Sequence, residues 1–142
     1  MSNQNNSSVI ALDMGQKRIG VAIASLVARI ARPLTTLQHT ETIIDDLKQL
    51  LVEHQAAALV VGLPRGLEGQ HTAQTASVEA FVATLKKHIA VPLYWQDEAV
   101  TSHHAETELE ARKKPFSKGD IDALAATYIL EDFLQELPKE LK

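Results

Sequence analysis

The sequence predicts an α/β fold, a mixed five-stranded sheet flanked by helices. Two observations support this class. Near the start of the chain, two apolar segments of strand length are joined by a connection too short for a helix, which favours an antiparallel hairpin. Farther along, apolar segments of strand length alternate with segments whose apolar residues recur at helical spacing, which favours strands reached through helices. The predicted element order is β-β-β-α-β-α-β-α-α.

The first three predicted strands are consecutive, and the last two each follow a helical segment. Only Met14 to Lys17 separate the first two strands, so they should pair as a hairpin. Strands that follow helices pair in parallel, which makes the predicted sheet mixed. The predicted strands are residues 9–13, 18–25, 33–38, 57–61 and 92–96.

Four helices are predicted from the spacing of apolar side chains. In the first, apolar residues recur at positions 43, 44, 47, 50 and 51. The last is apolar nearly all round between Ile121 and Leu130, so we expect most of its sides to be covered. The predicted helices are residues 41–54, 72–89, 103–111 and 120–137.

Length and composition indicate one globular domain, predicted over residues 9–137, with flexible ends at 1–8 and 138–142. The 142 residues include no cysteine, which excludes a disulfide scaffold, thiolate zinc sites and a cysteine nucleophile. The N-terminal residues lack the basic and apolar segments of a signal peptide, and no apolar run is long enough to span a membrane. We therefore expect a cytoplasmic protein without a membrane partner.

The net charge of −4 argues at first sight against a nucleic-acid partner, because proteins that bind nucleic acid usually present a strongly basic face. The charge is uneven, however. Residues 1–40 contain four basic residues and one acidic residue: Lys17, Arg18, Arg29, Arg32 and Asp13. The basic excess near the N-terminus therefore leaves a nucleic-acid substrate open.

Acidic side chains stand at the ends of three predicted elements. Asp13 closes the first strand, Asp97 and Glu98 close the last, and Asp122 lies near the start of the apolar helix. Each has a structural alternative: Asp13 could open a turn, and the acidic pair could simply end its strand. Asp122 could favour the helix dipole, but Asp120 already fills that role.

If these element ends converge, the acids form a carboxylate cluster that requires a cation. Two carboxylates about 4 Å apart repel by roughly 4 kcal/mol at an effective dielectric constant near 20. Ligand sets made only of oxygen suit Mg²⁺ or Mn²⁺ rather than zinc. Two such ions would clamp the attacking and leaving oxygens of a phosphodiester, which predicts a two-metal site.

Four ordered motifs in this chain resemble those of the YqgF family of pre-16S rRNA nucleases, relatives of the RuvC-type Holliday-junction resolvases. The resemblance extends from Val9 to Leu134. The matching segments are Asp13 to Ala22 (Asp-Met-Gly-Gln-Lys-Arg-Ile-Gly-Val-Ala), Val61 to Pro64 followed by Gly66 and Gly69, Asp97-Glu98 with Thr101, and Ile121 to Ala126 (Ile-Asp-Ala-Leu-Ala-Ala).

The resemblance implies an RNase H-like fold and a divalent-metal nuclease that processes the 5′ end of precursor 16S rRNA. It makes Asp13, Glu98 and Asp122 the catalytic and metal-binding acids. Lys17 and Arg18 match the family's basic pair, and we expect both to contact phosphate. Arg65, in a glycine-rich loop, is a third candidate substrate contact.

Two positions depart from the family pattern. Ala99 stands where the family usually has arginine after the Asp-Glu pair, and Glu68 stands where relatives often have aspartate. If that arginine binds phosphate in relatives, this chain must use another base or bind more weakly. The choice between Asp97 and Glu98 as the ligand also stays open at this point.

Other functions remain open alongside RNA cleavage. The same metal site would serve a resolvase-like nuclease acting on branched DNA, and Ala99 fits a catalytically weak RNA-binding factor in ribosome assembly. His103 and His104, with Glu106 and Glu108, have the spacing of a metal site, although such a pattern more often forms an exposed helix face.

An actin-like kinase fold is excluded because it needs two lobes around its nucleotide, and 142 residues supply only one. A homodimer stays possible.

Overall fold

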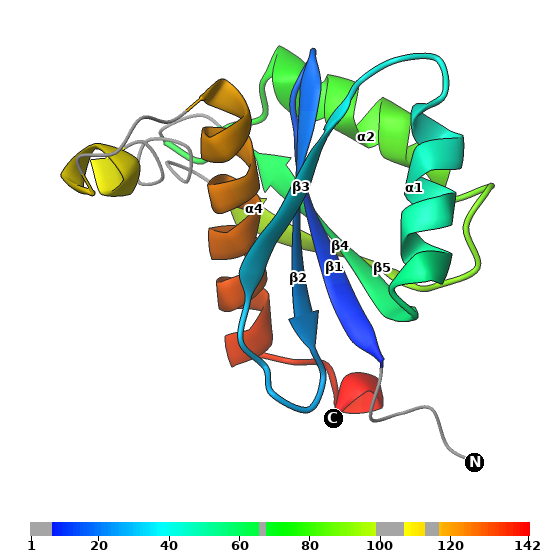
Figure 1. Cartoon of the computed structure of the whole chain (residues 1–142). Coiled ribbons are helices and arrows are strands. Elements are labelled where there is room, and N and C mark those ends of the chain that lie inside the picture. The colour runs from blue at the N-terminus through cyan, green and yellow to red at the C-terminus, as the bar shows by residue number, and fades with distance from the viewer. Residues whose placement is uncertain (1–6, 66–67, 99–106, 113–116) are drawn as a thin grey trace.

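A five-stranded sheet forms the centre of the computed structural model, which describes residues 7–65, 68–98, 107–112 and 117–142 (Figure 1). The strand order is β3-β2-β1-β4-β5. β2 pairs antiparallel with both β1 and β3, whereas β4 pairs in parallel with β1 and β5, so the predicted mixed sheet is confirmed. The strands are β1 Ser8–Met14, β2 Arg18–Ser25, β3 Arg32–Gln38, β4 Ala56–Pro64 and β5 Leu93–Glu98.

Helices cover both faces of the sheet. α1 and α2 lie on one face and α4 lies on the other (Figure 1). Each agrees with a predicted helix to within a few residues at its ends. The predicted helix 103–111 lies partly outside the described residues, and residues 107–111 are helical. The helices are α1 Ile43–Glu53, α2 Ala73–Leu85, α4 Lys118–Gln135 and the short 3₁₀ helix η2 Lys139–Leu141.

The alternation of side chains along β1 divides the core into two layers. Ile10, Leu12 and Met14 pack on the α1–α2 face, while Val9 and Ala11 pack on the α4 face. Asp13 has the same parity as Val9 and Ala11, so its position belongs to the α4 face. Every residue of β1 is buried, as expected for a strand in the middle of a sheet with both faces covered.

Small side chains line the layer between the sheet and α4. Ala22 and Ala24 of β2 pack there with Ala126 of α4, and larger apolar residues of the helix extend the layer toward its C-terminal end. α4 crosses mainly β2, with further contacts to β1 and β3. The other side of the helix packs Leu124 against Leu109 from residues 107–111, which explains why the sequence of α4 is apolar nearly all round.

The C-terminal residues, which we expected to be flexible over 138–142, have defined contacts in the structure. Residues Lys139–Leu141 form the 3₁₀ helix η2, and Leu141 packs against the core layer beneath α4. The Tyr94 hydroxyl donates a hydrogen bond of 2.7 Å to Glu140 Oε1. The packing of Leu141 and the hydrogen bond of Glu140 together hold the end of the chain against the core and β5. Among the described residues, no helix has the length and apolar character to cross a bilayer.

Candidate active site

The acids singled out in the sequence stand at one edge of the sheet. β1, β4 and β5 are parallel, so their carboxyl ends meet at the same edge, and the N-terminal turns of α4 lie beside it (Figure 1). This arrangement places Asp13, Asp97 and Asp122 around the end of the sheet, with Arg65 just after β4. Open α/β sheets typically bind ligands outside the carboxyl ends of their strands.

Asp13 is the most buried of the described acids at this end of the sheet, with 9% of its surface exposed. It pairs across the β1–β2 ladder with Gly20, one residue beyond Leu12, the last residue of β1 that pairs with β4. A carboxylate this deeply buried is costly unless hydrogen bonds or a cation compensate for its lost hydration. Asp13 thus stands at the carboxyl end of β1, where the sequence predicted a ligand, and its role stays a prediction.

Gly20 allows α4 to approach β2 directly opposite Asp13. A Cβ atom built on Gly20 would overlap the backbone carbonyl group of Asp122. Only glycine therefore permits this contact between strand and helix, and the contact brings the backbone of Asp122 next to the ladder partner of Asp13. Our sequence reasoning did not single out Gly20, although a glycine inside an apolar strand is a known signal of close backbone approach.

Two sets of hydrogen bonds fix the start of α4. Ser117 Oγ accepts from the Asp120 backbone N–H at 3.2 Å, and Asp120 Oδ2 accepts from the Ser117 N–H at 2.9 Å, which completes a capping box. Thr36 Oγ1 of β3 donates a hydrogen bond of 2.8 Å to the Gly119 carbonyl oxygen. The N-cap is therefore Ser117, and Asp120, expected from the sequence to cap the helix, completes the box from the third helical position, so Asp122 takes no part in the cap.

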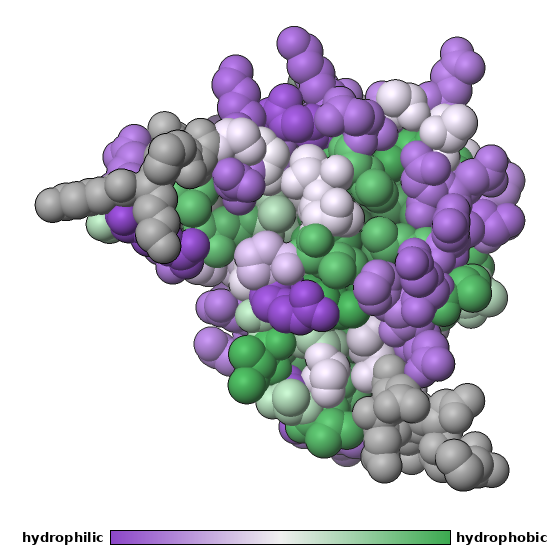
Figure 2. Space-filling view, viewed as in Figure 1, coloured by the Kyte–Doolittle hydropathy of each residue, from purple (hydrophilic) through white to green (hydrophobic). Residues whose placement is uncertain are grey.

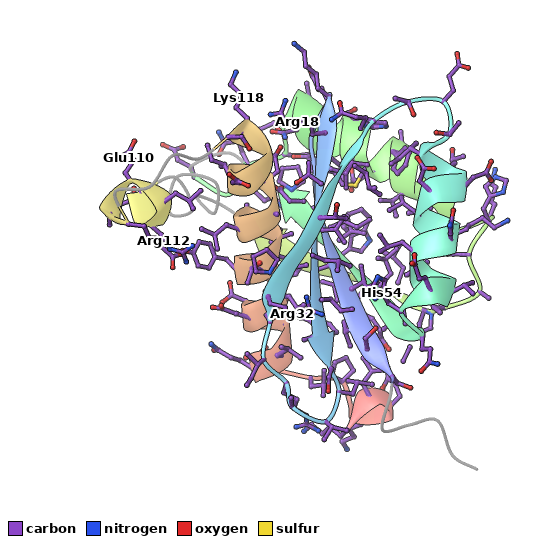
Figure 3. The ribbon with its side chains drawn as sticks, viewed as in Figure 1. Arg18, Arg32, His54, Glu110, Arg112 and Lys118 are labelled. Carbon is purple, nitrogen blue, oxygen red and sulfur yellow. The ribbon has the colours of Figure 1, made fainter. Side chains whose placement is uncertain are left out.

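Asp122 is paired with Arg18, the second member of the basic pair. Arg18 Nε donates to Asp122 Oδ2 at 2.7 Å, and the two side chains are 28% and 20% exposed. We expected Arg18 to contact substrate phosphate, but the structure places it on a candidate catalytic acid. Arg18 therefore compensates the negative charge of Asp122 in this arrangement. Figure 3 shows Arg18 at the same end of the molecule as Lys118, the first residue of α4.

Asp97 and Arg65 form a second, looser ion pair. Arg65 Nε lies 3.5 Å from Asp97 Oδ1, and the Asp97 side chain is 75% exposed. Alternation along β5 gives Asp97 the parity of Leu93, which packs on the α1–α2 face, and gives Glu98 the parity of Tyr94, which packs on the α4 face. Asp97 therefore occupies a position on the opposite face from Asp13; the Glu98 side chain lies outside the described part of the structure.

The oxygen donors of this edge fit a hard divalent cation, although the structure does not bring a complete ligand set together. Asp13 and Asp122 supply carboxylates with the oxygen chemistry that Mg²⁺ and Mn²⁺ prefer. Within the described side chains, no group of three acids or histidines is arranged to hold a metal. The alternative set of His103, His104 and Glu106 lies outside the described residues, and Glu108 instead pairs with Arg112 at 2.9 Å.

Lys17 occupies the turn between β1 and β2. Its side chain is exposed and makes no ion pair with any residue that the structure describes, so it is available to an anionic ligand. Glu68, at the other departure from the family pattern, is exposed in the loop before α2. Ala99 and residues 66–67 lie outside the described ranges.

Comparison with known proteins finds relatives over most of this chain. A family described as "RuvX: Holliday junction resolvase" matches residues 7–136. Relatives named "Putative pre-16S rRNA nuclease" include one from Chloroflexus aggregans, 39% identical over 92% of this chain and 94% of the relative. Another, from Rickettsia typhi, is 35% identical over 94% of this chain and 88% of the relative.

Solved structures share the fold at low sequence identity. Thermus thermophilus RuvC in complex with a Holliday junction substrate gives a TM-score of 0.57 at 17% identity, covering 92% of this chain and 96% of that chain. The fowlpox virus Holliday junction resolvase gives 0.56 at 11% identity, covering 92% and 99%. The fold is thus RNase H-like in the manner of RuvC, and the chain belongs to the RuvX (YqgF) family of nucleases.

Proposed function

We propose that this protein is a divalent-metal-dependent nuclease that hydrolyses phosphodiester bonds in RNA and processes the 5′ end of precursor 16S rRNA in the cytoplasm. The observation that carries the proposal is the contact at Gly20, which packs the backbone of Asp122 against the ladder partner of Asp13. Two carboxylates of the family motifs thereby stand at one edge of the sheet. The names of the curated relatives support the choice of RNA as substrate.

Three carboxylates would hold the metal in this proposal: Asp13, Glu98 and Asp122. Bound Mg²⁺ or Mn²⁺ ions would supply an activated water and stabilise the leaving oxygen. Asp13 offers a ligand on a buried strand paired with β2, and the position of Asp97, on the face of β5 opposite to that of Asp13, argues against Asp97 as the ligand. A rigid first ligand keeps the site preorganised, because a buried strand does not rearrange when the substrate arrives.

Basic residues around the site would bind the phosphate backbone. Lys17 is exposed and unpaired among the described residues, and Arg65 lies at the end of β4 beside Asp97. Arg18 compensates Asp122 while no cation is bound and can turn to a phosphate once a cation takes over that carboxylate. Such contacts give affinity without reading the base sequence.

Replacement of Asp13 by asparagine tests the assignment. Asp13→Asn keeps the shape of the side chain but removes its charge, so metal-dependent cleavage of a labelled precursor rRNA fragment should fall by at least about 10²-fold. The matched control is Asp45→Asn, an exposed acid in the first turn of α1. Wild-type cleavage should occur with Mg²⁺ or Mn²⁺ and stop in EDTA; undiminished cleavage by Asp13→Asn would refute the assignment.

Cleavage of branched DNA is a second candidate, because the matching family is described as a Holliday junction resolvase. A four-way DNA junction and the precursor rRNA fragment, offered together at equal concentration, separate the two activities. We expect the RNA to be cut first. Preferential cutting of the junction would make the protein a resolvase, and binding of RNA with no cleavage in any metal would make it an assembly factor.

A further inference from the structure

A pocket of about 360 Å³ lies next to the candidate active site, on the opposite face of β1. Its walls come from the end of β1 and the following turn, from the residue after β3, and from residues 73–81 of α2. Figure 2 shows hydrophobic surface between β3 and the helices α1 and α2, on the face where this pocket lies. The lining residues that matter here are Met14, Gln16, His39, Gln74, Ser77 and Phe81.

The floor of the pocket includes Met14, the last residue of β1, the strand that also carries Asp13. Met14 follows Asp13 directly in β1, and alternation turns the two side chains to opposite faces of the sheet. A group held against Met14 and a phosphate held near Asp13 would therefore be one residue apart along the protein backbone. The pocket and the candidate site therefore adjoin at the end of β1, where residues 14–16 begin the turn, so a substrate strand that crosses this end of the sheet can reach both.

Two rings form an aromatic wall whose orientation is fixed. His39 and Phe81 make an edge-to-face contact, with ring centroids 5.0 Å apart and planes at 73°. His39 Nδ1 donates to the Gly15 carbonyl oxygen at 3.0 Å, and the His39 backbone N–H donates to the Lys17 carbonyl oxygen at 2.8 Å. The turn that carries the basic pair therefore also holds the wall of the pocket in place.

The rim of the pocket is polar and uncharged. Gln16, Gln74 and Ser77 are exposed there, and their side chains form no hydrogen bond with another residue that the structure describes. Amide and hydroxyl groups both donate and accept, as do the edges of nucleobases. None of the described lining residues is acidic, and Lys17 stands beside the opening, so an adjoining phosphate is not repelled.

We propose that this pocket receives one unpaired nucleobase of the substrate strand, adjacent to the phosphate that is cleaved; the proposal rests on the assignment of the protein as an RNA nuclease. The volume is at the small end of the roughly 300–1,000 Å³ typical of small-molecule sites, which suits one planar ring system and excludes a duplex. Sequence-tolerant binding of unpaired RNA commonly uses bases stacked on aromatic side chains. The pocket thus makes single-stranded RNA the preferred substrate.

Methionine methyl signals provide a direct readout of base binding. The chain has only two methionines, Met1 and Met14, so ¹³C-methyl labelling of the full-length protein gives one reporter in the pocket and one internal control. The protein is titrated in EDTA with a single-stranded hexaribonucleotide, its duplex, uridine 5′-monophosphate and ribose 5-phosphate. The Met14 signal should shift with the single strand and the mononucleotide, while the Met1 signal stays in place and ribose 5-phosphate has no effect.

A matched pair of variants tests the same pocket by filling it. Ser77→Trp places a large ring in the pocket from an exposed position of α2, whereas Ala83→Trp adds the same ring to an exposed position of α2 that does not line it. Single-stranded RNA should bind at least about fivefold more weakly to Ser77→Trp, the smallest loss expected for one stacked base, and with unchanged affinity to Ala83→Trp. Equal affinities for the two variants would overturn the proposal, provided that both melt as the wild type does.

The outcomes separate the pocket from the nuclease assignment. RNA cleavage by the wild type without any Met14 shift at saturating single strand overturns the pocket alone. A Met14 shift together with full activity of Asp13→Asn supports the pocket and refutes the catalytic assignment. An equal Met14 shift with duplex RNA overturns the requirement for an unpaired base, and a shift with the mononucleotide alone overturns the RNA subsite in favour of a free nucleotide.

Discussion

Gly20 and Arg18 position the same carboxylate from neighbouring places on β2. Gly20 leaves space for the backbone of Asp122, and Arg18 holds its side chain at 2.7 Å. Both residues lie on the side of the strand that faces α4, because they have the parity of Ala22 and Ala24. Gly20 therefore fixes the backbone of Asp122, because it has no side chain, and Arg18 fixes the carboxylate through the ion pair.

Gly20→Ala should damage both stability and activity. The added methyl group cannot fit against the Asp122 carbonyl, so α4 must move away from β2, at a cost of about 1–3 kcal/mol of unfolding free energy. The matched control is Gly119→Ala, at the start of α4, where the added Cβ would meet its nearest neighbour at an ordinary 3.5 Å. That variant should be neutral or more stable by up to about 1 kcal/mol, because alanine favours helix.

Urea unfolding and the RNA cleavage assay measure both variants. If Gly20→Ala were as stable and as active as Gly119→Ala, the contact between β2 and α4 would not determine the geometry of the site.

Among the elements, η2 and β5 support each other at the end of the molecule away from the site. The Tyr94 ring packs against Phe133 of α4, with centroids 5.4 Å apart, and its hydroxyl bonds to Glu140. This hydrogen bond lowers the pKa of Glu140 and, with burial and the adjacent negative charge, raises the pKa of Tyr94. The contact is therefore strongest when Glu140 is ionised and Tyr94 is neutral.

Tyr94→Phe should lower the urea midpoint at neutral pH, because it removes the hydrogen bond and retains the ring contact. Since the pKa of Glu140 is lowered on folding, its contribution is present above the unfolded-state pKa near 4.3 and is lost as the pH falls through the folded-state value. Since the pKa of Tyr94 is raised, its contribution is present below about 10 and is lost as the pH rises through the folded-state value.

The difference in midpoint between wild type and Tyr94→Phe should therefore shrink at both extremes of pH. Tyr128→Phe is the matched control, because its hydroxyl makes no hydrogen bond with another described residue. A difference that stays constant from acid to neutral pH would contradict the role given to Glu140.

At the scale of the whole molecule, charge is distributed so that a net acidic protein can bind an acidic polymer. Without the three candidate ligands, the net charge would be −1 instead of −4. Bound divalent ions would make the occupied edge locally positive, next to the basic residues of the N-terminal segment. The acidic balance that argued against nucleic acid therefore resides largely in the proposed site itself.

Removal of the metal should weaken RNA binding strongly. In EDTA the carboxylates repel the phosphates and Arg18 stays paired with Asp122, so Lys17 and Arg65 supply the remaining attraction. The logarithm of the affinity should then fall with the logarithm of salt concentration with a slope of about −1.4. Fluorescence anisotropy with single-stranded RNA measures this slope. Lys17→Ala should reduce its magnitude by about 0.7, and Lys48→Ala, at an exposed position of α1, should leave it unchanged.

Tight binding of RNA in EDTA would contradict this electrostatic account, as would equal salt slopes for the Lys17 and Lys48 variants.

The fold could be predicted from local sequence patterns, whereas the pairing inside the site could not. The bounds of β2 match the predicted strand, residues 18–25, because apolar composition and the short preceding turn are local signals. Arg18 and Asp122 are 104 residues apart in the chain, and no periodicity connects them. Their contact follows from the way α4 crosses β2, which depends on the missing side chain of Gly20. The aromatic wall of His39 and Phe81 likewise arises only from packing between β3 and α2.

The position of β5 at the edge of the sheet divides the site into two parts with different resistance to local opening. β1 is paired with β2 on one side and, up to Leu12, with β4 on the other, so its central amides should exchange with solvent more slowly than those of β5. β5 is bonded on one side only, and Asp97 near its end is largely exposed. A local opening at the β5 edge would therefore loosen the Asp97 side of the site first, while the part built on β1 and α4 stays assembled.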